Sequence, residues 1–122
     1  MSSQKILIID DDVSVSTAVK MILEDKYNVS TTTCALSAYK YLSECKVDLV
    51  LLDIKMPKIN GIEALKEIKK RHPAIIVIML TAYASDDNVR KANTLGAYGF
   101  ISKPFDVEEL RIYIDEVLSG NA

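Results

Sequence analysis

Residues 47–53 read Val-Asp-Leu-Val-Leu-Leu-Asp, a short apolar run that ends at the carboxylate of Asp53. The run over residues 49–52 is too short for a helix and shows no polar alternation, which is typical of a strand buried on both faces. Residues 5–9 have the same character and run directly into three aspartates. Two such strands predict a parallel sheet with carboxylates along one edge.

Three more segments complete the predicted sheet. Residues 75–80 and 98–101 are also apolar, whereas residues 27–32 are β-branched and partly polar, as expected of an edge strand. Apolar residues at helical spacing lie between these runs, and they predict helices within residues 15–23, 37–44, 62–68, 85–95 and 107–118. The alternation predicts one α/β domain over residues 1–122, a doubly wound five-stranded parallel sheet with five helices on two faces.

Composition excludes several classes of function. Fifteen Lys and Arg against seventeen Asp and Glu give a net charge of −2, so we expect no direct binding of nucleic acid. The first residues suit neither a signal peptide nor a membrane span, which favours a cytoplasmic location without membrane contact. Cys34, Cys45 and the single His72 lack the spacing of a zinc site or a disulfide framework, so we expect both cysteines to be reduced packing residues.

Four predicted strand ends carry polar side chains, namely Asp10 with Asp11, Asp53, Thr81 and Lys103. The carboxyl ends of parallel strands meet at one edge of the sheet, where ligands bind in this fold class. Neighbouring carboxylates repel one another unless a cation neutralises them, and an all-oxygen set favours a hard ion such as Mg²⁺. Each residue alone also has an ordinary structural explanation, but the combination favours a functional site.

Other polar residues are expected to end helices. Asp12 is predicted to be a helix N-cap, and Asp106 with Glu109 three residues later matches a capping box. Gly96 and Gly120 lie where helices are expected to terminate.

The segments ILIIDDD, DLVLLDIKMPKINGIE, VIMLTAY and GAYGFISKPF together resemble the receiver domains of two-component response regulators, over nearly the whole chain. The resemblance implies the flavodoxin-like strand order 2-1-3-4-5. It implies a signalling domain and not an enzyme that turns over other substrates: Asp53 would accept a phosphoryl group from a phosphohistidine of a sensor histidine kinase or phosphotransfer protein, with Mg²⁺ or Mn²⁺ as cofactor.

The resemblance also assigns the metal ligands. Asp11 would bind the ion directly, Asp10 through water, and Asp53 and the backbone carbonyl of Lys55 would complete the protein ligands.

The remaining site residues would contact the phosphoryl group or respond to it. Thr81 would bind a phosphoryl oxygen and Lys103 would pair with the group, and the bond between Lys103 and Pro104 is often cis in this family. Phe100 stands where many members carry a Tyr, so Thr81 and Phe100 form the expected switch. Phosphorylation would alter contacts with an output domain or target protein, in a monomer or a phosphorylation-dependent dimer.

The expected readout face has an open alternative. It would comprise the fourth helix, fifth strand and fifth helix, with Arg90, Lys91, Tyr98 and Tyr113 as candidate contacts, although a merely solvated face is as consistent with these residues. The sequence departs from the family pattern at residues 58–61, Lys-Ile-Asn-Gly, where Gly-Met-Asp-Gly is common. This departure is expected to alter the loop over the site more than its chemistry.

Three other functions are less consistent with the sequence. A haloacid-dehalogenase-like phosphatase needs a second aspartate two residues after the nucleophile, where this chain has Lys55. An FMN-binding flavodoxin-like module is disfavoured because the aspartates at residues 10–12 would repel the phosphate. A receiver-like domain that binds partners without phosphorylation is disfavoured by the complete set of acids.

Overall fold

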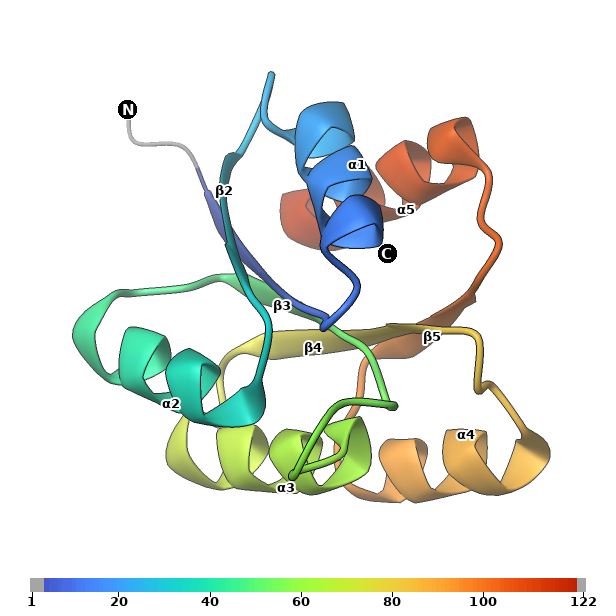
Figure 1. Ribbon diagram of the computed structural model, residues 1–122. Helices are drawn as coiled ribbons and strands as arrows, with labels where there is room; N and C mark the ends of the chain where they lie inside the picture. The colour runs from blue at the N-terminus through green and yellow to red at the C-terminus, as the bar shows by residue number, and fades with distance from the viewer. Residues whose placement is uncertain (1–3, 121–122) are drawn as a thin grey trace.

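The computed structural model describes residues 4–120, in which a parallel sheet lies between two layers of helices (Figure 1). The strands are β1 (Lys5–Ile9), β2 (Asn28–Thr32), β3 (Leu49–Leu52), β4 (Ile76–Thr81) and β5 (Gly99–Ser102). The helices are α1 (Val13–Leu23), α2 (Ala35–Glu44), α3 (Gly61–Arg71), α4 (Asp86–Thr94) and α5 (Val107–Ser119). The strand order is β2-β1-β3-β4-β5 with every pair parallel, which confirms the predicted fold and its order.

The helices divide between the two faces of the sheet. Figure 1 shows α1 and α5 on one face and α2, α3 and α4 on the other. Successive residues of a strand point to opposite faces, so Ile8 packs with the α1 and α5 side while Leu7 and Ile9 pack with the α2 and α3 side. All four residues of β3 are fully buried, because helices cover both of its faces.

The predicted boundaries are correct to within three residues, the largest difference being at the end of α3, and two of the differences have clear local causes. Tyr27 belongs to the turn after α1, because its N–H donates to the carbonyl of Leu23 at 3.0 Å. β4 extends to Thr81, because Thr81 is paired with Ser102 of β5. The edge position predicted for residues 27–32 is confirmed for β2.

Capping explains where several helices begin and end. The Asp12 side chain accepts the N–H groups of Ser14 and Val15, which confirms it as the N-cap of α1. Asp106 likewise accepts the Glu109 N–H at 3.0 Å, but the reciprocal half of a capping box is not among the hydrogen bonds of residues 4–120. A complete capping box occurs instead at Asn60, the N-cap of α3. Gly96 and Gly120 lie at the ends of α4 and α5, as predicted, and both have a positive φ.

The cysteines differ from their predicted role. Both are free thiols, but they flank α2 instead of filling the core, with Cys34 half-buried at the N-cap and Cys45 exposed at the C-cap. The short polar turns around α2 place these positions at the surface. Within residues 4–120, no helix has both the length and the apolar character that crossing a membrane requires.

Candidate functional site

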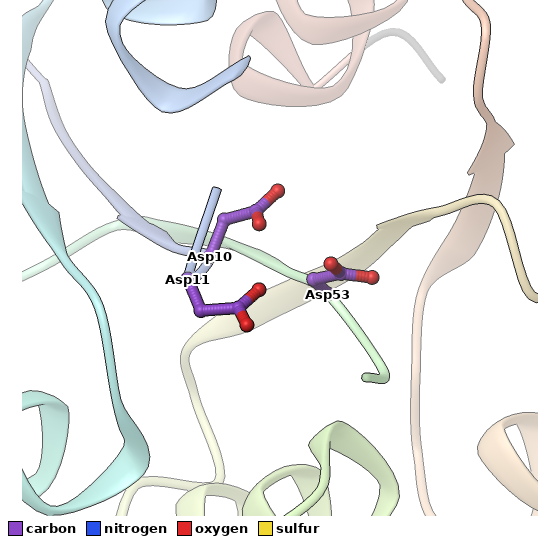
Figure 2. Close-up of side chains that lie close together, drawn as sticks. All are labelled: Asp10, Asp11 and Asp53. Atoms are coloured by element: carbon purple, nitrogen blue, oxygen red, sulfur yellow. The ribbon is translucent and has the colours of Figure 1, made fainter. Parts of the chain in front are cut away.

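Three carboxylates meet at the carboxyl-terminal edge of the sheet. Asp10 and Asp11 directly follow β1 and Asp53 follows β3, its neighbour in the sheet. One oxygen from each side chain lies within 4.8 Å of the others. Figure 2 shows the Asp11 carboxylate directed toward Asp53, with Asp10 beside it. Asp10 and Asp53 are buried, whereas Asp11 is exposed and opens the cluster to solvent.

Both oxygens of Asp10 already have hydrogen-bond partners. Its Oδ1 accepts the N–H of Asp12 at 2.9 Å, and its Oδ2 accepts the Lys103 ammonium at 2.7 Å. Burial raises the pKa of Asp10 despite the Lys103 hydrogen bond, and the nearby charge of Asp53 adds to the increase. Burial alone would lower the pKa of Lys103, but the hydrogen bond and charge of Asp10 raise it above its usual value. The ammonium is therefore the built-in counter-charge of this cluster.

The two oxygens of Asp53 are not equivalent. Oδ1 accepts the N–H of the next residue, Ile54, at 2.7 Å, while Oδ2 lies 3.4 Å from the Lys103 ammonium. The backbone of Asp53 is also held, because its N–H donates to the Ile9 carbonyl at 3.0 Å. The carboxylate is thus fixed in orientation, and among residues 4–120 the ammonium of Lys103 is the positive charge that forms an ion pair with it.

Lys103 reaches the acids because the chain after β5 is anchored to β4. The Lys103 N–H donates to the Thr81 carbonyl at 2.9 Å, and the peptide bond between Lys103 and Pro104 is cis. Thr81 has no exposed surface, and its hydroxyl accepts the N–H of Tyr83 at 3.1 Å. The last residue of β4 and the chain after β5 therefore meet beside the acids.

Phe100 lies on β5, opposite Met79 of β4. It is half-buried and packs against the core on the side of α2, α3 and α4. Thr81 is two residues after Met79 on the same strand, so both side chains lie on that face of the sheet. The predicted pair of Thr81 and Phe100 therefore shares one face of the sheet.

Two loops border the site. The Lys55 ammonium lies over the ring of Tyr83, 5.4 Å from the ring centre, and so joins the loop after β3 to the loop after β4. Lys58, in the same β3–α3 loop, has a φ of 68°, which is unusual for a residue other than glycine. This is the position where the resemblance predicted glycine, so the departure in sequence is a strained residue in the structure.

The readout candidates are less closely grouped. Arg90 and Lys91 of α4 are exposed and approach Asp87 of the same helix, at 3.8 Å and 3.2 Å. Tyr98 is exposed beside β5, and the half-buried Tyr113 of α5 places its hydroxyl over Gly99.

The cluster fits a hard divalent ion in its donor chemistry. It offers only oxygen atoms, which hard cations such as Mg²⁺ and Mn²⁺ prefer, and it offers neither thiolate nor imidazole. The carboxylates carry more negative charge than Lys103 can neutralise, and the raised pKa of Asp10 reflects that excess together with burial. Sequence reasoning had identified these residues, but not how closely Gly61 and Ile54 approach Asp53; the glycine in the loop after the strand was the only available signal.

Comparisons with known proteins agree on one family. A family model for the response regulator receiver domain matches residues 6–115. The chain is 39% identical to the transcriptional regulatory protein ZraR of Klebsiella oxytoca, over 93% of this chain but only 26% of that protein. It is 34% identical to sporulation initiation phosphotransferase F of Bacillus subtilis, over 97% of this chain and 96% of that protein.

The solved structures give the same result. The crystal structure of a CheY-like response regulator receiver domain protein from Methanospirillum hungatei superposes with a TM-score of 0.94 at 34% identity. That match covers 98% of this chain and 97% of the other. The chain therefore spans nearly all of some similar proteins and about a quarter of ZraR.

Proposed function

Because the chain belongs to the family of response regulator receiver domains, we propose that Asp53 accepts a phosphoryl group from a phosphohistidine of a sensor histidine kinase or phosphotransfer protein. The reaction requires Mg²⁺ or Mn²⁺. The observation that carries the proposal is the meeting of Asp10, Asp11 and Asp53 within 4.8 Å, with the Lys103 ammonium between two of them.

Asp53 acts as an ionised carboxylate, so the transfer needs no general base. A P–O bond to Asp53 forms as the P–N bond of the donor breaks, and charge on the phosphoryl oxygens is neutralised in place. The Ile54 N–H bond holds the carboxylate in one orientation, and Lys103, 3.4 Å from Oδ2, supplies one of the positive charges. Later hydrolysis of the acyl phosphate resets the domain.

The metal ion would be held by Asp11 and Asp53 directly, by Asp10 through water and by the Lys55 carbonyl. The two hydrogen bonds already made by the Asp10 oxygens support an indirect contact for that residue. When bound, the ion supplies positive charge to the transferring phosphoryl group. The exposure of Asp11 supports entry of the ion from that side of the cluster.

Phosphorylation acts through Thr81 and Phe100. The phosphoryl oxygens attract the Thr81 hydroxyl, which now accepts only the Tyr83 N–H, and the space it leaves lets the Phe100 ring turn inward. Phe100 has no hydroxyl, so its inward position is stabilised by burial alone. The altered face of α4, β5 and α5 then binds an output domain or a target protein, in a monomer or a phosphorylation-dependent dimer.

The phospho-donor docks around the site itself. Helix N-termini and strand C-termini share one end of this fold, and exposed apolar side chains occupy that end. They are Val13 of α1, Leu36 of α2, Tyr83 of the β4–α4 loop and Val107 of α5. Exposed apolar residues at the same end of the fold as a charged centre suit a protein partner that must exclude water from the transfer.

Taken together, residues 1–122 constitute a single cytoplasmic signalling domain that catalyses only its own phosphorylation and dephosphorylation. It does not contact nucleic acid or membrane directly.

The decisive experiment is intact-mass analysis after incubation with acetyl phosphate and Mg²⁺. The native protein should gain one phosphoryl group, Asp53→Asn should gain none, and EDTA or Asp11→Ala should largely prevent labelling because each removes the ion or a direct ligand. A normal adduct on Asp53→Asn would refute the assignment of the acceptor.

Asp12→Asn is the matched control. Asp12 is adjacent in sequence to the acidic pair, but its carboxylate caps α1, a role that asparagine performs equally well. Asp12→Asn should therefore label like the native protein. Loss of labelling in this variant would mean that any acid removed from the region disables the site.

A further inference from the structure

We propose that Gly61 is a positioning residue for this reaction: the absence of a side chain at Gly61 lets α3 contact the backbone of Asp53 and thereby fixes the loop that carries Lys55. The inference rests on the proposed function, because it concerns the metal-binding role of that loop. Any amino acid with a Cβ atom at position 61 would prevent the observed approach of α3 to Asp53.

The contact is with main-chain atoms. A Cβ built on Gly61 would overlap the carbonyl oxygen of Asp53 and would lie 2.6 Å from the Cα of Ile54. No side chain could rotate away to relieve either contact. Gly61 is not among the residues with positive φ, so it is the space and not the backbone conformation that requires glycine.

Two further bonds hold the loop at the same place. The Gly61 N–H donates to the Ile54 carbonyl at 2.6 Å and closes residues 54–61 into a loop. Asn60 and Glu63 form the capping box that starts α3 beside it. Lys55 lies within this closed loop and directly follows the Asp53–Ile54 peptide, which Gly61 contacts. The direction of the Lys55 carbonyl therefore depends on the closure of the loop.

A methyl group at residue 61 must therefore displace either α3 or the backbone of Asp53 and Ile54 by about 1 Å or more. A displacement on that scale costs on the order of 100-fold in rate when it moves a reacting group. It would also misalign the Lys55 carbonyl and weaken the binding of Mg²⁺. A merely structural role would instead lower stability without altering either property.

The test compares Gly61→Ala with Gly120→Ala. Gly120 has a φ of 80° and no neighbouring atom within 4 Å of a built Cβ, so its variant is strained but far from the site. Mg²⁺ dissociation constants come from amide chemical shifts in an NMR titration, and initial labelling rates come from acetyl phosphate at saturating Mg²⁺. Unfolding midpoints in EDTA report the stability of both variants.

Gly61→Ala should raise the Mg²⁺ dissociation constant at least about tenfold and slow labelling about 100-fold. Gly120→Ala should lower the unfolding midpoint, but its Mg²⁺ dissociation constant and labelling rate should stay within about twofold of the native values. Native affinity and rate in folded Gly61→Ala would overturn the inference. Failure of the native protein itself to bind Mg²⁺ or to be labelled would instead refute the proposed function.

If Gly61→Ala does not fold, Asn60 provides a second route. Asn60→Ala removes the cap at the end of the same loop and should weaken Mg²⁺ binding several-fold, whereas Asn60→Asp keeps an acceptor oxygen and should restore it. Equal Mg²⁺ affinity in native protein, Asn60→Ala and Asn60→Asp would overturn the inference.

Discussion

Replacing Asp53 with asparagine should stabilise the metal-free protein even though we expect the same change to prevent phosphorylation. The asparagine side chain would retain the shape of the aspartate and an oxygen able to accept the Ile54 N–H, now 2.7 Å from Oδ1. What the variant loses is one negative charge beside Asp10 and Asp11, and the attraction to Lys103. The variant is more stable than the native protein if the repulsion that it removes exceeds the attraction to Lys103 that it loses.

The distances allow an estimate. At 4.8 Å, the upper limit of the separations between these oxygens, and at an effective dielectric constant of about 20, each carboxylate repels Asp53 by at least about 3.5 kcal/mol. The Lys103 ammonium at 3.4 Å attracts it by about 5 kcal/mol. Two repulsions exceed one attraction by about 2 kcal/mol, and solvent screening at the exposed Asp11 reduces the difference to about 1 kcal/mol.

Urea unfolding in EDTA at pH 7, followed by circular dichroism, measures this difference. A gain of about 1 kcal/mol corresponds to a midpoint raised by about 0.5 M at unchanged m. Glu108→Gln is the control for net charge, because Glu108 is an exposed acid in the first turn of α5 and its removal should not stabilise the protein.

Mg²⁺ should reverse the order of stability, so that the native protein becomes more stable than Asp53→Asn. An ion at about 100 times its dissociation constant stabilises the native protein by about 2.7 kcal/mol, and the variant gains less because it lacks one carboxylate ligand. An Asp53→Asn midpoint at or below that of the native protein in EDTA would refute the reasoning, as would equal stabilisation of both proteins by Mg²⁺.

Three other substitutions test separate features. Lys58→Gly should raise the unfolding free energy by about 1 kcal/mol, because glycine adopts the φ of 68° without strain; an unchanged urea midpoint would contradict this. Tyr27→Phe should lower the free energy of unfolding by about 1 kcal/mol near neutral pH, because it removes the hydrogen bond to Asp115. That bond lowers the pKa of Asp115, so the difference between the two proteins in urea titrations should disappear as pH falls through the lowered pKa. Burial raises the pKa of Asp10, so in EDTA this group should add stability as pH falls through the raised pKa toward the ordinary value of an aspartate. The difference between the native and Asp10→Asn urea midpoints should therefore change with pH in that range, and a pH-independent difference would contradict the assigned shift.

Residues at the ends of strands were predictable because of a simple regularity. A strand buried on both faces must be apolar throughout, so the first acid after residues 5–9 or 49–52 marks both the end of the strand and the edge of the sheet. Parallel pairing then brings Asp10 and Asp53 together without knowledge of any side-chain position. The strand order itself came only from the resemblance, since hydrophobic periodicity is the same for every order.

Contacts that depend on backbone approach were not predictable in this way. The sequence of the β3–α3 loop shows a glycine at residue 61 and a departure from the family pattern at residue 58, but neither letter specifies the contact of Gly61 with Asp53 or the positive φ of Lys58. One Asp10 oxygen accepts the Asp12 N–H and the other accepts the Lys103 ammonium. The second contact could not be predicted either, because it depends on where the chain after β5 is hydrogen-bonded to β4. The cysteines were misplaced because hydrophobic character alone does not distinguish a core position from a helix end.

The position of Lys103 beside Asp10 and Asp53, in a cluster of three carboxylates, also determines how phosphorylation can be sensed at a distance. With the ammonium and a divalent ion in place, the charges of the three acids are balanced. Converting the Asp53 carboxylate to an acyl phosphate replaces a single charge by one of about −2, so the net charge of the site changes by only about −1. A change of that size is largely screened beyond about 10 Å in physiological salt. A partner on the far side of β5 would therefore detect rearranged side chains and not the field of the phosphoryl group.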